Sequence, residues 1–116
     1  MLTEKDNCDH ETCVALSNLG CPVPKYDTIN IYTKEKEWKM WLSLYEAQKW
    51  LRKEKQIEVN AAWDNEKSYW FWYINEMTDI DYYNNVVSES IYDSYEEALL
   101  EGIKKVIKFL KEKNND

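Results

Sequence analysis

The sequence has 116 residues, enough for one domain with a single core, and its 44% hydrophobic content is typical of a folded globular protein. A formal net charge of −7 argues against nonspecific binding to nucleic-acid phosphates or anionic membranes, and no run approaches the ~20 apolar residues of a membrane span. The 15% aromatic content, with only two Gly and two Pro, excludes a disordered chain.

The N-terminal part of the chain predicts a short helix followed by a strand or hairpin. The helix covers residues 9–19: Asp9 is a suitable N-cap, apolar residues recur at helical spacing, and a glycine followed by two prolines ends it. Residues 26–32 alternate in character, which predicts a strand. The charged stretch 34–37 is expected to be an exposed turn, after which a short strand through Trp38 returns.

Two capping boxes, in which a serine is followed three residues later by a glutamate, predict the starts of the main helices. Ser43 and Glu46 open a helix through about residue 54, and Ser94 and Glu97 open a longer one to about residue 111. Each helix carries an apolar stripe that is expected to face the core. The stripes comprise Leu44, Ala47, Trp50 and Leu51, and then Tyr95, Ala98, Leu99, Gly102, Ile103, Val106, Ile107 and Leu110.

Three strands are predicted between these helices, over residues 57–63, 68–77 and 88–92. The first two alternate in hydrophobicity and are separated by a polar turn. A two-residue turn would pair Trp63 with Ser68, and the residues two positions further along each strand would then pair in the same way. In that register, the two strands share a wholly apolar face suited to the helices.

This order of elements predicts an α+β fold, in which an antiparallel sheet carries the two main helices on one face. We expect a single domain over residues 1–116. It would consist of an N-terminal helix and strand or hairpin (1–42), a helix–strands–helix core (43–112) and a frayed tail (113–116).

Two features of the pattern resemble nucleic-acid-binding folds, and the charges argue against both. Double-stranded-RNA-binding domains have the same order of elements but place basic residues at the start of the second helix, where this chain has Asp93, Glu96 and Glu97. An aromatic platform on which bases stack would normally lie in a basic field, which is missing here. Direct nucleic-acid binding is therefore not expected.

Two segments of the core, SLYEAQKWLRKE at 43–54 and YEEALLEGI at 95–103, resemble a group of small uncharacterised proteins of gut Bacteroidetes and their phages. In that group an AQKWLRE-like helix, a hairpin and a SYEEALEAGI-like helix follow one another. An LLKELG-like helix precedes them, where this chain has VALSNLG at 14–20. The resemblance covers most of the chain and implies this order of elements and a bacterial or phage origin. It implies no activity, because the group has no assigned function.

All three cysteines and the only histidine lie close together in the sequence: Cys8, His10, Cys13 and Cys21. They are the candidate metal ligands, because zinc binds four such side chains in a tetrahedron. The alternative is that the cysteines are small buried hydrophobic residues. Their spacing differs from that of paired zinc knuckles, and Cys13 falls on the apolar stripe of the predicted helix. No other cofactor is expected.

The strand at 68–77 carries a row of aromatic residues, Tyr69, Phe71 and Tyr73, on the side predicted to face away from the helices. Such a row is either covered by another part of the chain or presented to a partner. Residues 21–41 are the candidate cover. If they lie elsewhere, the row is a candidate surface for self-association or partner binding.

Acidic residues dominate the stretch between Lys67 and Lys104, which contains no Lys or Arg. One interpretation is an acidic patch that docks on a basic partner, with Glu96, Glu97 and Glu101 as its contacts. The alternative is a solvated face whose acids stabilise the start of a helix. The acidic residues are Glu76, Asp79, Asp81, Glu89, Asp93, Glu96, Glu97 and Glu101.

No phosphate-binding loop, nucleophile elbow, paired-histidine helix or dinucleotide-binding fingerprint occurs in the sequence, so a non-enzymatic protein is expected. The first hypothesis is a protein-interaction module that uses the aromatic row. The second is an inhibitor of a host defence enzyme that uses the acidic patch, and the third is a zinc-stabilised module. Because the first residues lack the basic start and apolar stretch of a signal peptide, we expect the bacterial cytoplasm as the location.

Overall fold

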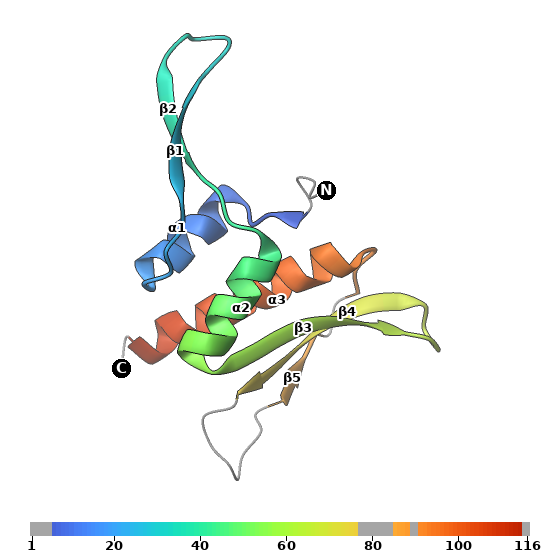
Figure 1. Cartoon of the computed structure of the whole chain (residues 1–116). Helices are drawn as coiled ribbons and strands as arrows, with labels where there is room; N and C mark the ends of the chain where they lie inside the picture. The colour runs from blue at the N-terminus through green and yellow to red at the C-terminus, as the bar shows by residue number, and fades with distance from the viewer. Residues whose placement is uncertain (1–5, 77–84, 89–90, 115–116) are drawn as a thin grey trace.

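A computed structural model of the chain describes residues 6–76, 85–88 and 91–114. In these residues the chain is an α+β protein, as predicted, with two antiparallel sheets (Figure 1). The elements in chain order are α1 (His10–Asn18), β1 (Lys25–Ile29), β2 (Lys36–Met40), α2 (Leu44–Lys55), β3 (Ile57–Asp64), β4 (Tyr69–Glu76), β5 (Asn85–Val87) and α3 (Tyr95–Asn114).

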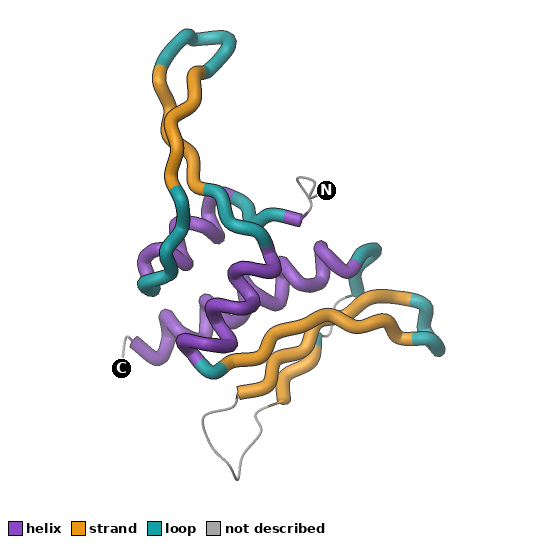
Figure 2. Tube along the Cα trace, viewed as in Figure 1, coloured by secondary structure: helices purple, strands orange, loops and turns teal. Residues whose placement is uncertain are grey.

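The elements form layers, with α2 and α3 between the three-stranded sheet and the N-terminal part of the chain. The sheet has the order β3-β4-β5, and both α2 and α3 pack on one of its faces (Figure 2). The hairpin β1–β2 and α1 lie on the far side of the helices from the sheet (Figure 1). The predicted helix–strands–helix core is therefore confirmed, and the N-terminal extension contacts it through α1, which packs against α3.

All three predicted N-caps are confirmed by hydrogen bonds. Asp9 Oδ1 accepts from the Thr12 N–H (2.8 Å), and the Ser43 and Ser94 hydroxyl oxygens accept from backbone N–H groups three residues on (3.0 and 3.1 Å). Each bond satisfies one of the donors that the first turn of a helix leaves without an intrahelical partner. The end of α3 differs from the prediction, because the helix continues past residue 111 to Asn114; residues 115–116 of the predicted frayed tail lie outside the described residues.

The core lies between the sheet and the two main helices. The predicted stripes are largely buried, but on α2 the buried set includes Gln48, whereas Trp50 is only half-buried. Gly102 is buried in α3, where its lack of a side chain lets the helix approach β3 and β4 closely. The largest fully buried side chains are Leu16, Leu44, Leu51, Leu99, Ile103, Val59, Val106 and Cys13.

The predicted register of β3 and β4 is wrong by two residues. The strands are joined by four turn residues, 65–68, so that Trp63 pairs with Trp70 rather than with Ser68. Asp64 holds this longer turn, because its carbonyl accepts from the Ser68 N–H (2.8 Å) and its carboxylate accepts from two further turn N–H groups. A shift of two residues leaves each side chain on its predicted face.

The end of this strand pair also differs from the prediction. Trp63 was expected in the core, but it is 47% exposed, because the β3–β4 hairpin extends beyond the helices (Figure 1). Trp63 packs edge-on against Trp70 instead, at a centroid distance of 5.4 Å, and Trp70 in turn contacts Tyr95 at 5.6 Å. These rings cover the end of the core that lies beyond α2 and α3.

The third strand lies earlier in the chain than predicted. It covers Asn85–Val87, whereas the prediction was 88–92. Ser88 still bonds to β4 through its N–H and the Trp72 carbonyl (3.0 Å), and Tyr92 forms an isolated bridge with Trp70. The predicted strand therefore contains two real contacts with β4, but residues 89–90 between them lie outside the described residues, as does Met77 at the predicted end of the preceding strand.

The N-terminal hairpin has its turn earlier than predicted and projects from the body of the molecule (Figure 1). The strand predicted over 26–32 ends at Ile29, and the turn comprises residues 30–35 rather than 34–37. Asn30 Oδ1 holds the turn by accepting from the N–H groups of Tyr32 (2.9 Å) and Thr33 (3.1 Å). Such Asx turns explain why asparagine determines the position of the reversal.

Candidate partner-binding surfaces

The aromatic row of β4 lies on the open face of the sheet, opposite α2 and α3. Tyr69, Phe71 and Tyr73 are half-buried, and both consecutive pairs have ring centroids 6.5 Å apart. Their cross-strand neighbours include Ala62 and, on β5, the 54% exposed Val87. The row is therefore a continuous line of aromatic rings along the middle strand of the sheet.

The predicted cover of this row is not found among the described residues. Residues 21–41 form the hairpin and its connections, on the other side of the helix layer from the sheet (Figure 1). The N-terminal part contacts the helix layer there through the packing of α1 on α3 and an ion pair between Asp9 and Lys104 of α3 (3.2 Å). Within the N-terminal part, the Cys8 N–H donates to the Leu42 carbonyl (2.9 Å). The open face of the sheet consequently has no helix or strand of the described residues packed over its rings.

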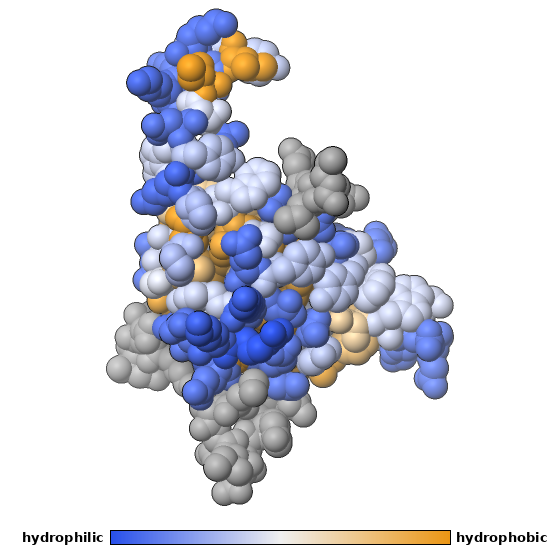
Figure 3. All heavy atoms as spheres, viewed as in Figure 1, coloured by the Kyte–Doolittle hydropathy of each residue, from blue (hydrophilic) through white to orange (hydrophobic). Residues whose placement is uncertain are grey.

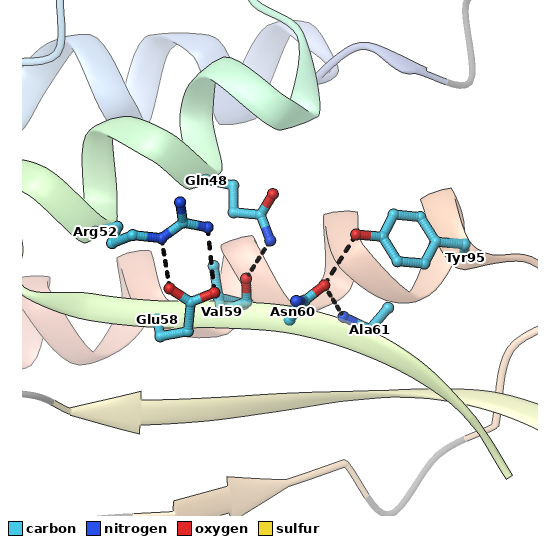
Figure 4. Close-up of polar contacts among 7 residues, drawn as sticks. All are labelled: Gln48, Arg52, Glu58, Val59, Asn60, Ala61 and Tyr95. Carbon is cyan, nitrogen blue, oxygen red and sulfur yellow. Dashed lines mark hydrogen bonds and ion pairs between the residues drawn. The ribbon is translucent and has the colours of Figure 1, made fainter.

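Side chains occupy the outer edge of β3, beside this face (Figure 4). The Gln48 Nε2 atom donates to the Val59 carbonyl (2.7 Å), and the Asn60 side chain accepts from the Ala61 N–H (2.8 Å) and from the Tyr95 hydroxyl (2.9 Å). The backbone groups of Val59 and Ala61 point away from β4. On β4, Trp70 and Trp72 direct their backbone groups toward β5, and the direction alternates along a strand. The residues paired with them on β3 therefore direct their groups to the opposite side, toward the outer edge. For a further strand, the Val59 carbonyl and the Ala61 N–H are therefore already bonded.

The acidic candidates lie on the first turns of α3. Glu97 is exposed and Glu96 is half-buried, and both line a groove of about 450 Å³ together with Asp9. The third candidate, Glu101, does not line this groove and forms an ion pair with Lys104 (3.4 Å), which also pairs with Asp9. The structure therefore brings two of the three predicted acidic contacts together, whereas Glu76, Asp79, Asp81 and Glu89 have no described side chain.

The cysteine and histidine candidates do not converge. Cys8, Cys13 and Cys21 are buried, whereas His10 is exposed and its ring lies 5.8 Å from that of Trp38. Cys13 donates weakly to the Cys8 carbonyl (3.8 Å), which is typical of a packed thiol. Within the described residues, no group of three or more His, Cys, Asp or Glu side chains is arranged to hold a metal ion.

Burial also decides the charge of these thiols. Desolvation raises the pKa of Cys21 to about 11 and the pKa of Cys8 still further above its ordinary value. Nearby Cys13 adds to both shifts, since a second thiolate would repel the first. The three cysteines therefore have the environment of neutral core residues, and the thiolate that metals and electrophiles require is disfavoured.

The hairpin is the exposed apolar surface that the sequence pattern did not reveal. Its alternating residues predicted a strand, and in the structure most of its large apolar side chains reach solvent, with apolar residues visible at its tip (Figure 3). A groove of about 790 Å³ lies between residues 7–10 and β2. The exposed side chains are Tyr26, Ile29, Ile31, Tyr32, Trp38 and Trp41.

Comparisons with known proteins give no relative from which a site could be transferred: no family model, curated protein or solved structure matches the chain. Of the helices that the structure describes, none has the length and apolar character needed to cross a membrane.

Proposed function

We propose that this protein is a non-enzymatic protein-interaction module and that its partner binds the open face of the β3-β4-β5 sheet. The observation that supports this proposal is the row of Tyr69, Phe71 and Tyr73 on a face over which no described helix or strand packs. Aromatic residues dominate the energetics of protein interfaces, because they bury large areas while losing little conformational freedom.

The chemistry of this face favours a partner with aliphatic and basic side chains. Neither β4 nor β5 contains a Lys or Arg, so the ring faces have no cation of their own strands above them. Arginine and lysine bind over such rings by cation–π attraction and lay their aliphatic stems along them. The overall charge of −7 would attract a basic partner and repel an acidic one.

The test compares the wild-type protein with a variant that combines Tyr69→Ala, Phe71→Ala and Tyr73→Ala. Tyr45→Ala is the matched control, because this tyrosine is 38% exposed on α2, in the helix layer away from the open face. In affinity capture from cell lysate with quantitative mass spectrometry, a basic protein should be retained by the wild type and by the control and lost with the triple variant. Equal retention by all three proteins, with circular dichroism confirming that each is folded, contradicts the proposal.

The acidic groove at the start of α3 supports a second candidate function, an inhibitor that docks on a basic enzyme surface. Asp9, Glu96 and Glu97 line this groove; because Asp9 is paired with Lys104, Glu96 and Glu97 are its candidate contacts. Such binding would weaken steeply with salt, since exposed charges are screened. Glu96→Lys with Glu97→Lys should then abolish capture of the basic partner, whereas Glu54→Lys, an exposed acid on α2, should not. Capture unaffected by the two substitutions contradicts this candidate.

A further inference from the structure

The outer edge of β2 directs backbone hydrogen-bonding groups away from the hairpin. The Trp41 N–H donates to the Pro24 carbonyl on the β1 side (3.1 Å), which places the backbone groups of Trp41 toward β1. Because this direction alternates along a strand, Lys36, Trp38 and Met40 direct their N–H and C=O groups outward. In the part of the chain that the structure describes, no strand pairs with this edge over Lys36–Met40; just past β2, the Leu42 carbonyl on the same edge accepts from the Cys8 N–H (2.9 Å).

The sequence of β2 complements itself about its central residue. When two copies of residues 36–40 are placed antiparallel with Trp38 opposite Trp38, each Glu37 lies opposite the Lys39 of the other copy. Opposite charges and paired aromatic rings are both stabilising cross-strand neighbours. The outward-directed residues also coincide, because Lys36 then faces Met40 and the two Trp38 residues exchange backbone hydrogen bonds.

We propose that β2 binds β2 of a second copy of this chain, so that two hairpins form a four-stranded antiparallel sheet around a two-fold axis at Trp38. A two-stranded hairpin that projects into water is marginally stable alone, and two further strands give it the size of an independent sheet. The interface is isologous, as in most soluble homodimers. This inference goes beyond the proposed function, since it uses neither the aromatic row nor the acidic groove.

The exposed apolar side chains of the hairpin fit this arrangement. Antiparallel pairing lays the tip of each hairpin beside the base of the other. The tip carries Ile31 and Tyr32, which are 72% and 88% exposed. The groove of about 790 Å³ runs along β2, between this strand and residues 7–10, and its lining includes Trp38 and Trp41. Pairing of the two β2 strands would therefore bury exposed apolar area of the hairpin in each copy, including that of Trp38, which is 53% exposed.

Other edges of the molecule are less suited to a second copy. A two-fold axis on the outer edge of β1 at Asp27 would bring two carboxylates together. The outer edge of β3 is occupied by the side chains of Gln48 and Asn60. Charge also favours the hairpin: residues 25–39 carry four lysines against three acidic residues, whereas the whole chain has a net charge of −7 and repels its copies elsewhere.

The first test reverses the charges of Glu37 and Lys39 and measures the dimer dissociation constant by sedimentation equilibrium. Glu37→Lys places lysine opposite Lys39 twice, and Lys39→Glu places glutamate opposite Glu37 twice, so each should weaken dimerisation by about tenfold. The double variant restores both attractions and should dimerise as the wild type does. A monomeric wild type, or a dimer unaffected by either single change, overturns the proposal.

Cross-linking locates the axis. Trp38→Cys should form a disulfide-linked dimer on mild oxidation, because a residue on the two-fold axis meets itself at a Cα separation of about 5.5 Å. Lys36→Cys is the matched control and should not, because Lys36 faces Met40 of the second copy. The triple variant of the aromatic row should remain dimeric; if it becomes monomeric, the sheet and not the hairpin joins the copies, and the proposal fails. Equal cross-linking of the two cysteine variants also overturns it.

Discussion

Gly102 is the position where the close approach of α3 to the sheet can be tested directly. A Cβ atom at this position would lie 2.8 Å from the Val59 Cγ2 atom and 3.0 Å from the Trp72 Cβ atom. Both contacts are shorter than van der Waals contact between carbon atoms, about 3.5–4.0 Å. Gly102→Ala therefore sets two opposite effects against each other: a better helix former on α3 and an overpacked contact with β3 and β4.

The balance of the two effects can be estimated from the neighbouring atoms. Alanine is preferred over glycine within a helix by about 1 kcal/mol. Overpacking of a well-packed core costs about 1–3 kcal/mol, and the upper part of this range applies, because the Trp72 Cβ cannot move without its strand and Val59 is stiff about χ1. The free energy of unfolding should fall by about 1–2 kcal/mol, which corresponds to a decrease in Tm of about 4–8 °C.

Urea denaturation followed by tryptophan fluorescence measures this change. Lys111→Ala, an exposed substitution on the same helix, should stay within about 0.5 kcal/mol of the wild type. Val59→Ala removes the closest atom, so in a double-mutant cycle its effect and that of Gly102→Ala should be non-additive, with an interaction free energy of about 1 kcal/mol. A Gly102→Ala variant that is as stable as the wild type, or more stable, would refute the close approach.

Three further predictions concern the N-cap of α2, the buried thiols, and the ion pair between Asp9 and Lys104. Ser43→Ala should lower the free energy of unfolding by about 1 kcal/mol, because the first turn of α2 loses its cap; an unchanged urea midpoint contradicts this. At pH 8 an aromatic disulfide reagent should label Cys8 and Cys21 only as the protein unfolds, because burial raises the pKa of both thiols, that of Cys21 to about 11; immediate labelling contradicts this. Burial alone would raise the pKa of the Asp9 carboxyl, but hydrogen bonds from Thr12 and Lys104 lower this pKa below its ordinary value. The ionised Asp9 carboxylate therefore contributes fully to the free energy of unfolding above about pH 4, and this contribution is lost as the pH falls through the lowered pKa. Asp9→Asn should thus reduce the urea midpoint at about pH 7 and have a smaller effect at about pH 2; equal effects at both would contradict the linkage.

Local signals in the sequence were sufficient for the core of the fold. Each helix start is determined within four residues, by Asp9, Ser43 or Ser94 and the N–H groups that follow, so the capping patterns placed all three. The face of each residue of β3 and β4 follows from alternation alone. The register does not, because it depends on how many residues the Asp64 carboxylate and carbonyl hold in the turn, and both two- and four-residue turns fit the pattern.

The position of the N-terminal part could not be predicted from local patterns, because distant contacts determine it. The ion pair between Asp9 and Lys104 and the bond from Cys8 to Leu42 join residues that are far apart in the sequence, and neither partner carries a signal for the other. Alternating residues at 26–32 predicted a strand, and this alternation is the same whether the strand lies on the core or in a hairpin that projects into solvent. The exposed Tyr32 therefore had no distinguishing signal in the sequence.

The outer edges of β3 and β2 differ in whether side chains already bond their backbone groups, and this difference indicates where another chain can add a strand. On β3, Gln48 reaches from α2 to the Val59 carbonyl, and Asn60 folds back on the Ala61 N–H, so side chains already bond the groups that an added strand would need. A sheet that leaves an edge open risks nonspecific association unless the edge is short, charged or paired. The β2 edge is short and carries Lys36, Glu37 and Lys39, which restricts pairing to a strand with the complementary order of charges, and β2 itself has that order. The same charges that protect this edge from other strands therefore select a second copy of the chain.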